Sequence, residues 1–223
     1  SETTYLIAEA RTHLAAIEAD LPTLLEGFQF SCPYSFRAAS LRELLRHRVS
    51  DLAQSTIPLL EQRRVVPAAI LSRAITETVA LLYSLHHELS AFLTQPDEPR
   101  IESFLKAGLV GSRNPEHPIQ AKNILTAIDK LDNEIPAFRR GYDALSEFAH
   151  PNWSGVLGAY GKIDYEEWSL ALGDRDNSKG IRVAAFVTAS VLSMFCHYYD
   201  SLADILRQFD RYFRDLEESS RGA

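Results

Sequence analysis

A long helical repeat near the C-terminus constrains this chain more than any other feature. Between residues 179 and 219, apolar residues recur at alternating intervals of three and four for about five heptads, from Ile181 to Leu216. This spacing predicts one continuous helix of roughly 60 Å, at about 1.5 Å per residue. Because a compact chain of 223 residues needs no rod of that length, we expect its end to project or to contact a partner.

Other segments are helical as well. Residues 7–28 repeat the alternating spacing, with an expected kink or break at Pro22. Ser40 and Glu43 form a capping box that predicts the start of a second helix. Residues 67–94 are apolar on all faces, which is typical of a central, buried helix. Shorter helices are predicted over residues 100–107, 119–131 and 137–149.

One segment departs from the helical period. Between residues 154 and 173 the apolar period changes to two around Gly158 and Gly161, which predicts a small β-hairpin or ribbon. A content of 46% hydrophobic and 24% charged residues excludes a disordered chain and a membrane bundle. We therefore expect one mainly α-helical domain over residues 1–223, a helical bundle with a long C-terminal helix and a small inserted β-hairpin.

Charge and motifs narrow the possible partners. A net charge of −7 is the wrong sign for a surface that neutralises many phosphates, so we expect no DNA partner and only local RNA contact. The sequence contains no GxGxxG, GxxxxGK[ST], GxSxG or HExxH motif, and we expect no cofactor. Cys32 and Cys196 lie far apart without metal-ligand spacing, so we expect no metal site and a reducing compartment.

The location is predicted from two further segments. Glu2 and Glu9 stand where a secretory signal would carry basic residues before an apolar run. The longest uncharged run, residues 183–199, continues the heptad pattern and therefore fits a buried bundle helix better than a membrane span. We expect a cytoplasmic protein without membrane contact.

Polar residues inside apolar helices are the first candidates for a site. Arg73 and Glu77 lie four residues apart in the apolar helix, share one face and should be desolvated. The pair is either an internal salt bridge that fixes helix register or an active pair in which Arg73 clamps an anion.

The second candidate site is a polar row on a later helix. Tyr142, Ser146 and His150 are spaced four by four, just before Pro151 and Asn152. Facing the first pair, they would give a catalytic set for phosphoryl or acyl chemistry. His150 would be the general base, Glu77 its orienter and Arg73 the anion clamp, with Tyr142, Ser146 and Asn152 binding substrate. Alternatively, His150 and Asn152 only tie the helix end to the hairpin.

A third candidate site is Arg42 with His47, which are separated by four residues and fit the R-x(4 to 6)-H pattern of HEPN ribonucleases. About 1.7 such matches are expected by chance in this composition, so the match carries little weight. We interpret Arg42, Arg46 and Arg48 as a solvated basic face, with a small patch for RNA or an acidic partner as the alternative.

Residues 71–83 and 142–153 together resemble a group of uncharacterised bacterial all-helical proteins, in which an R-x3-E helix is paired with a later Y-x3-S-x3-H-P helix end. That group is similar in layout to HEPN-like bundles, some of them toxin or defence ribonucleases and others non-catalytic partners. The resemblance covers about 25 residues and marks the same two candidate sites. HEPN ribonucleases carry Arg and His in one motif on a late helix, whereas Arg73 and His150 lie on separate elements here.

Three functions follow from these patterns. The resemblance implies a HEPN-like stress or defence domain that binds or cleaves RNA. The alternative is a non-catalytic interaction protein that forms a homodimer through its long helices and whose buried polar residues are structural. A third possibility is a small-ligand-binding bundle that uses the aromatic loop of residues 28–36.

Overall fold

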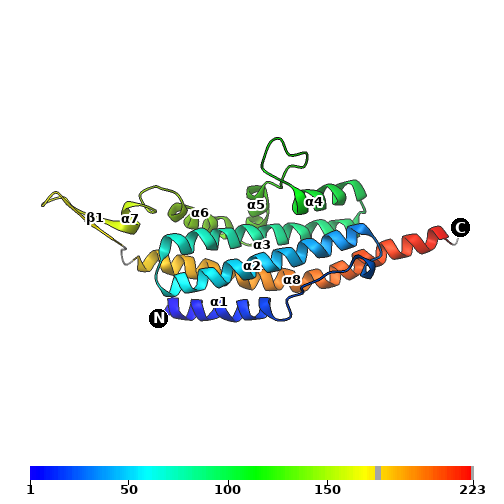
Figure 1. Cartoon of the computed structure of the whole chain (residues 1–223), viewed down its shortest axis with the longest axis horizontal. Helices are drawn as coiled ribbons and strands as arrows, with labels where there is room; N and C mark the ends of the chain where they lie inside the picture. The colour runs from blue at the N-terminus through cyan, green and yellow to red at the C-terminus, as the bar shows by residue number, and fades with distance from the viewer. Residues whose placement is uncertain (174–176, 222–223) are drawn as a thin grey trace.

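The chain folds into a bundle of helices with a short β-hairpin projecting from one end (Figure 1). The computed structural model describes residues 1–173 and 177–221. The elements are α1 (Glu2–Glu18), the 3-10 turn η1 (Gly27–Gln29), α2 (Pro33–Glu61), α3 (Val65–Thr94), α4 (Glu98–Val110), α5 (Ile124–Glu134), α6 (Phe138–Ala149), α7 (Leu157–Tyr160), β1 (Gly161–Asp164), β2 (Ser169–Leu172) and α8 (Ser178–Arg221). The predicted fold class is confirmed, since 75% of the chain is helical.

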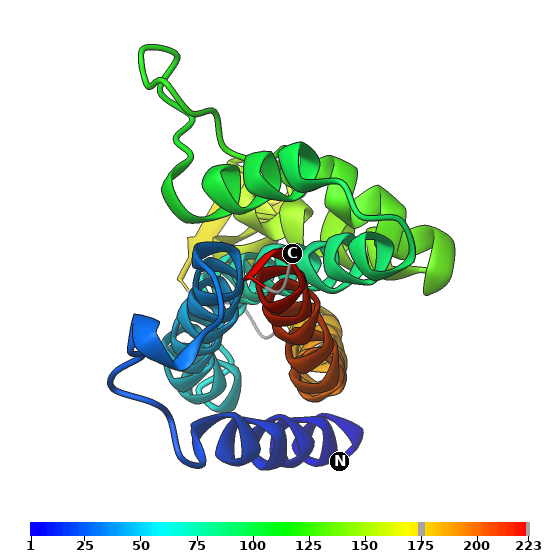
Figure 2. The same cartoon turned by 90° about the vertical axis from the view of Figure 1, so that its right-hand side faces the viewer.

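Helix α3 is the centre of the bundle. It packs against α2 and α8 on one side and against α4, α5 and α6 on the other, while α1 covers α2 and α8 from outside (Figure 2). Ala68, Ala69 and Ala80 are fully buried, and their small side chains let neighbouring helices approach closely. Between α3 and α8 the buried hydroxyls of Ser72 and Thr188 share a hydrogen bond of 2.7 Å. The prediction of a central, buried helix is confirmed.

The seam of α8 faces the inside of this bundle. Ile181, Phe195 and Phe209 are buried against the rest of the chain, so the predicted heptads form one face of a single helix. Phe92 of α3 packs edge-on against Phe209, with ring centroids 4.9 Å apart. Beyond Phe213 the last turns are exposed and extend past the other helices, as expected for a rod of this length (Figure 1).

The first helix ends earlier than the sequence pattern predicts. α1 stops at Glu18, and Leu24 and Phe28 are exposed, so the predicted seam over residues 7–28 is wrong beyond Ile17. Two local features stop the helix. Asp20 adopts a left-handed φ of 54°, and Pro22 disfavours helical geometry in the residue before it.

The second helix starts earlier than predicted. Pro33 opens α2, and Cys32 caps it, with its sulfur accepting a hydrogen bond from the Ser35 amide at 3.4 Å. Ser40 is therefore inside the helix, where its hydroxyl donates to the Phe36 carbonyl at 2.7 Å. The capping box is wrong because Pro33, with its fixed φ and no N–H, already suits a first helical turn. Helix α5, by contrast, begins later than predicted, at Ile124 rather than at residue 119.

A projecting segment follows α6, and we call residues 153–172 the arm. Its root is a tight turn. The Asn152 side chain accepts from the Gly155 amide at 3.1 Å and donates to Glu147 at 2.9 Å. A Cβ on Gly155 would lie 2.2 Å from the His150 carbonyl oxygen, so only glycine fits there. The predicted β-hairpin is confirmed, with β1 and β2 antiparallel and Gly161 opposite Leu172.

A half-buried histidine makes the stability of the fold depend on pH. His86 Nε2 lies 2.9 Å from the Ser201 hydroxyl, between α3 and α8. Burial lowers the pKa of His86, and the neighbouring imidazole of His197 lowers it further. The unfolded chain therefore binds a proton more readily than the folded chain below about pH 6.5. Stability is fully present above that pH and is lost as the pH falls towards the lower folded pKa.

We predict that His86→Gln reduces the loss of unfolding free energy between pH 7.5 and pH 5, because glutamine keeps polar contacts but does not titrate. The measurement is urea unfolding at both pH values. His150→Gln, which changes an exposed ring, is the matched control and should keep the wild-type loss. Equal losses in both variants would contradict the assignment.

Candidate functional site

Arg73 and Glu77 of α3 meet Tyr142 of α6. Arg73 Nε and Nη2 donate to the Tyr142 hydroxyl at 3.0 and 2.7 Å, and this hydroxyl donates to Glu77 Oε1 at 3.0 Å. Arg73 Nε lies 3.4 Å from the same carboxylate oxygen. The Arg73 and Glu77 side chains are 30% and 29% exposed, so the expected desolvation is only partial.

The Tyr142 phenol in this triad is a weak acid that keeps its proton. Burial raises the pKa of Tyr142 against the opposing hydrogen bonds from Arg73, and the hydrogen bond to Glu77 raises it further. The hydroxyl thus stays protonated, accepting from the guanidinium and donating to the carboxylate. The three side chains satisfy one another and join α3 to α6.

The remaining residues of the predicted site lie elsewhere. The Ser146 hydroxyl donates to the Tyr142 carbonyl within α6 at 2.9 Å. The His150 amide donates to the Ser146 carbonyl and ends the helix, while the His150 side chain is exposed. In the described residues no hydrogen bond or ion pair joins His150 to Arg73 or Glu77. Asn152 shapes the root of the arm, which is the structural role predicted as the alternative.

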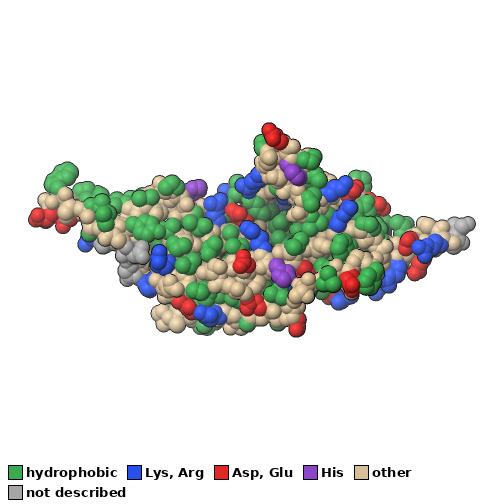
Figure 3. Space-filling view, viewed as in Figure 1, with side chains coloured by type: hydrophobic (Ala, Val, Ile, Leu, Met, Phe, Trp, Pro, Cys, Tyr) green, Lys and Arg blue, Asp and Glu red, His purple; other side chains and the backbone are tan. Residues whose placement is uncertain are grey.

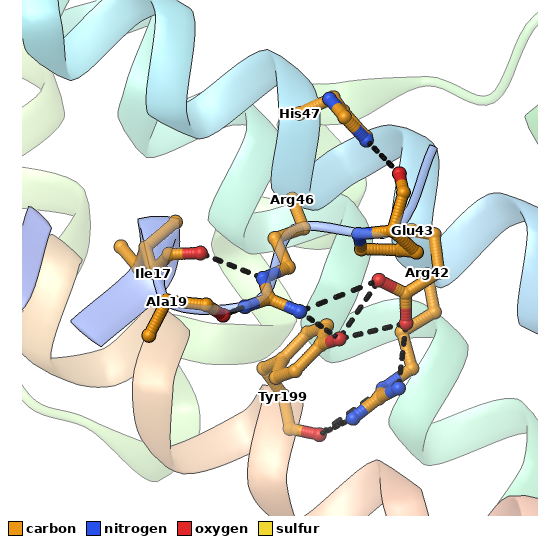
Figure 4. Close-up of polar contacts among 8 residues, drawn as sticks. Ile17, Ala19, Arg42, Glu43, Arg46, His47 and Tyr199 are labelled. Carbon is orange, nitrogen blue, oxygen red and sulfur yellow. Dashed lines mark hydrogen bonds and ion pairs between the residues drawn. The ribbon is translucent and has the colours of Figure 1, made fainter. Parts of the chain in front are cut away.

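A larger polar cluster lies between α2 and α8, and we call Arg42, Glu43, Arg46 and Tyr199 the Tyr199 cluster (Figure 4). The Tyr199 hydroxyl lies 2.7 and 2.8 Å from the two Glu43 oxygens and 2.9 Å from Arg46 Nη1. Arg42 Nη1 donates to Glu43 at 2.6 Å, and its Nη2 donates to the Tyr199 carbonyl at 2.9 Å. The Arg42 guanidinium lies 3.5 Å from the centre of the Tyr199 ring.

Arg46 also holds the end of α1. Its Nε donates to the Ile17 carbonyl at 2.7 Å, and its Nη2 donates to the Ala19 carbonyl. These carbonyls belong to the last turn of a helix, where no intrahelical donor reaches them. Arg46 is only 8% exposed and the Arg42 side chain only 14%, so the prediction of a solvated basic face is wrong for both residues. All three nitrogens of the Arg46 guanidinium donate to groups within the fold.

The surroundings of Tyr199 keep its hydroxyl protonated. Burial and the hydrogen bond to Glu43 raise the pKa of Tyr199 to about 12, so the phenol remains a donor at physiological pH. His47 is turned away from the cluster, with Nε2 2.8 Å from the Pro22 carbonyl oxygen (Figure 4). Arg42 and His47, the residues of the R-x4-H match, are therefore held in separate structural contacts.

Sequence reasoning missed this cluster because Tyr199 lies 153 positions from Arg46. Two signals could have indicated it. Arginine outnumbers lysine by 18 to 5, a bias that suits buried and bidentate contacts. Tyr199 also ends the uncharged run of α8, where a phenol needs a polar partner.

A groove of about 520 Å³ opens beside the cluster, between η1, α2 and the second half of α8. We call it the arginine groove, and its charged and apolar lining includes Arg42, Arg207, Arg211, Arg214, Leu25, Phe30 and Leu206. Asp210 at its floor accepts from the Ser31 amide at 2.7 Å and from Arg214 at 3.1 Å. Although burial alone would raise it, these hydrogen bonds lower the pKa of Asp210.

Other functional classes receive no support. Among residues 1–173 and 177–221, no group of three or more His, Cys, Asp or Glu side chains could hold a metal ion. Helices α3 and α8 are long and apolar enough to cross a membrane by composition alone, yet 56% of each apolar window is buried within the bundle. No family model, curated protein or solved structure matches the chain.

We predict that Tyr199→Phe lowers the free energy of unfolding by about 1–3 kcal/mol, because the buried Glu43 loses a hydroxyl donor and Arg46 loses an acceptor. Urea unfolding measures the change. Tyr212→Phe is the matched control on the same helix, where the ring packs on Phe92 and Phe213. A loss equal to that of the control would show that the cluster does not stabilise the fold.

Proposed function

We propose that this protein is a non-catalytic interaction protein that forms a homodimer through its projecting arm. One observation carries the proposal. Among the described residues, 17 large apolar side chains are exposed, and eight of them lie within the 20 residues of the arm. They are Trp153, Val156, Tyr160, Ile163, Tyr165, Trp168, Leu170 and Leu172.

The arm has one apolar face and one polar face. Ile163 pairs with Leu170, and Gly161 with Leu172, so these side chains share a face of the ribbon. A Cβ on Gly161 would lie 3.1 Å from Leu170 Cδ1, which shows that Leu170 covers this glycine. The opposite face carries polar pairs such as Asp164 with Ser169. An amphipathic ribbon of this kind is typical of a surface that is covered in an assembly.

Energetics also favour a covered arm. A two-stranded hairpin alone is marginally stable in water and needs further strands or a packing partner. Trp168 and Leu172 are 90% and 79% exposed. Burying one leucine-sized side chain contributes about 1.5–3 kcal/mol. In this proposal the partner is a second copy of the chain. Each molecule then carries both an arm and the surface that accepts an arm, so two equivalent contacts close a two-fold dimer.

The polar clusters support a structural role rather than catalysis. In the described part of the chain, every buried side-chain nitrogen or oxygen has a hydrogen-bond partner. The Arg73, Glu77 and Tyr142 side chains satisfy one another, and His150 stands apart from them. Neither polar cluster holds a Ser, Thr or Cys nucleophile beside a base, as nucleophilic catalysis requires. The contact of His86 with the Ser201 hydroxyl lies between the packed helices α3 and α8. Dimerisation through the α8 seam, as the sequence predicts, has little surface available, because that seam is buried within the bundle.

We predict a dimer of twice 25.0 kDa for the native protein in sedimentation velocity experiments. The double variant Trp168→Ser with Leu172→Ser should raise the dimer dissociation constant at least about tenfold, because it removes the two most exposed apolar side chains of the arm.

The matched control is Tyr5→Ser with Leu125→Ser, which removes exposed apolar side chains from α1 and α5. This control should remain a dimer. A native protein that stays monomeric at all concentrations, or an arm variant that dimerises as well as the control, would contradict the proposal.

A further inference from the structure

We infer that the arginine groove of one copy receives the tip of the arm of a second copy. The inference rests on the proposed homodimer and assigns the receptor site within it. The groove is cationic and partly apolar, whereas the tip of the arm is acidic and aromatic, so the two surfaces are complementary. They lie at opposite ends of the same molecule.

The arginine groove carries more positive charge than its own acidic residues balance. Its two acids are already neutralised, Glu43 within the Tyr199 cluster and Asp210 by Ser31 and Arg214. Arg207 is exposed, and its one ion pair among the described residues is with the exposed Asp204. Arg211 also lines the groove and forms no ion pair among the described residues. The Arg211 guanidinium is therefore open to a carboxylate, and Arg207 can exchange its surface pair with Asp204 for one. A guanidinium binds a carboxylate through two parallel hydrogen bonds.

The arm tip offers the complementary groups. The amides of Glu166 and Glu167 both donate to Asp164 Oδ1, at 2.9 and 3.1 Å, so Asp164 is used to hold the turn. The carboxylates of Glu166 and Glu167 are exposed, and they stand between the exposed rings of Tyr165 and Trp168. Figure 3 shows acidic and apolar side chains together on the projecting end of the molecule.

The volume and the apolar lining of the arginine groove also suit the tip of the arm. A groove of about 520 Å³ lies within the usual range of 300–1,000 Å³ for pockets that enclose a ligand. Leu25, Phe30 and Leu206 give it an apolar wall for an aromatic ring, and arginine also stacks on aromatic faces. Aromatic anchors surrounded by charged groups are typical of the residues that dominate binding energy in protein interfaces.

The position of the two sites determines the assembly. The arm projects beyond the N-terminal end of α8, whereas the groove lies along its C-terminal half, at the other end of the bundle (Figure 1). Two molecules lying antiparallel therefore place each arm at the groove of the other. Both contacts are equivalent by two-fold symmetry, so the assembly closes at two chains instead of growing into a fibre.

Charge reversal tests the inference. Arg207→Glu with Arg211→Glu gives a groove variant, and Glu166→Lys with Glu167→Lys gives an arm variant. Each alone should dimerise at least about tenfold more weakly than the native protein, because like charges then face each other. An equimolar mixture should recover the dimer, because both contacts of the mixed pair have opposite charges. Sedimentation velocity measures mass, and circular dichroism checks that each variant stays folded.

The outcomes separate the two proposals. If the apolar arm variant is monomeric while both charge variants dimerise normally, the homodimer stands and this receptor site is overturned. If the charge variants lose the dimer but their mixture does not recover it, the receptor site is also overturned. If none of these variants changes the mass, the arm proposal itself fails. Recovery in the mixture, with each variant weak alone, is the result that we expect.

Discussion

The rest of the structure depends on the close packing of α3 against its neighbours. Because α3 is apolar on all faces, it must be enclosed, and α2, α8 and the layer of α4 to α6 provide that enclosure. Fully buried alanines permit the approach, and the hydrogen bond between Ser72 and Thr188 satisfies the hydroxyls buried where α3 meets α8. Because this arrangement buries the seam of α8 within the bundle, eight of the 17 large apolar side chains that are exposed in the described residues lie in the arm.

The polar clusters have a common physical explanation. Each joins helices that are distant in sequence, α3 to α6 through Tyr142 and α2 to α8 through Tyr199. In both, a phenol with a raised pKa donates to a carboxylate and accepts from an arginine. Removing one member of such a partly or largely buried group leaves the others without partners, which is costly for the fold. Their chemistry therefore accounts for stability and helix register without requiring a substrate.

The sequence predicts the helices and the hairpin well because both follow from local periodicity. It also sets out the case in which the row of Tyr142, Ser146 and His150 faces Arg73 and Glu77. Of that row, Tyr142 is the residue that meets the pair. It fails where tertiary contacts override local patterns. The sequence pattern indicates that Arg46 lies on the surface, but the end of α1 packs beside it. Spacing alone does not predict that its side chain donates to the carbonyls of that helix end. The arginine groove is equally invisible in sequence, because it combines η1 with a part of α8 that lies about 180 residues away.

The most direct measurement uses the two tryptophans of the chain, Trp153 and Trp168, which both lie in the arm and are 70% and 90% exposed. Intrinsic tryptophan emission therefore reports on the arm of the unmodified protein. The account predicts that the emission maximum shifts to shorter wavelength as protein concentration rises, over the same range in which the mass changes from one chain to two. Emission typical of water-exposed tryptophan in a fully formed dimer would contradict it.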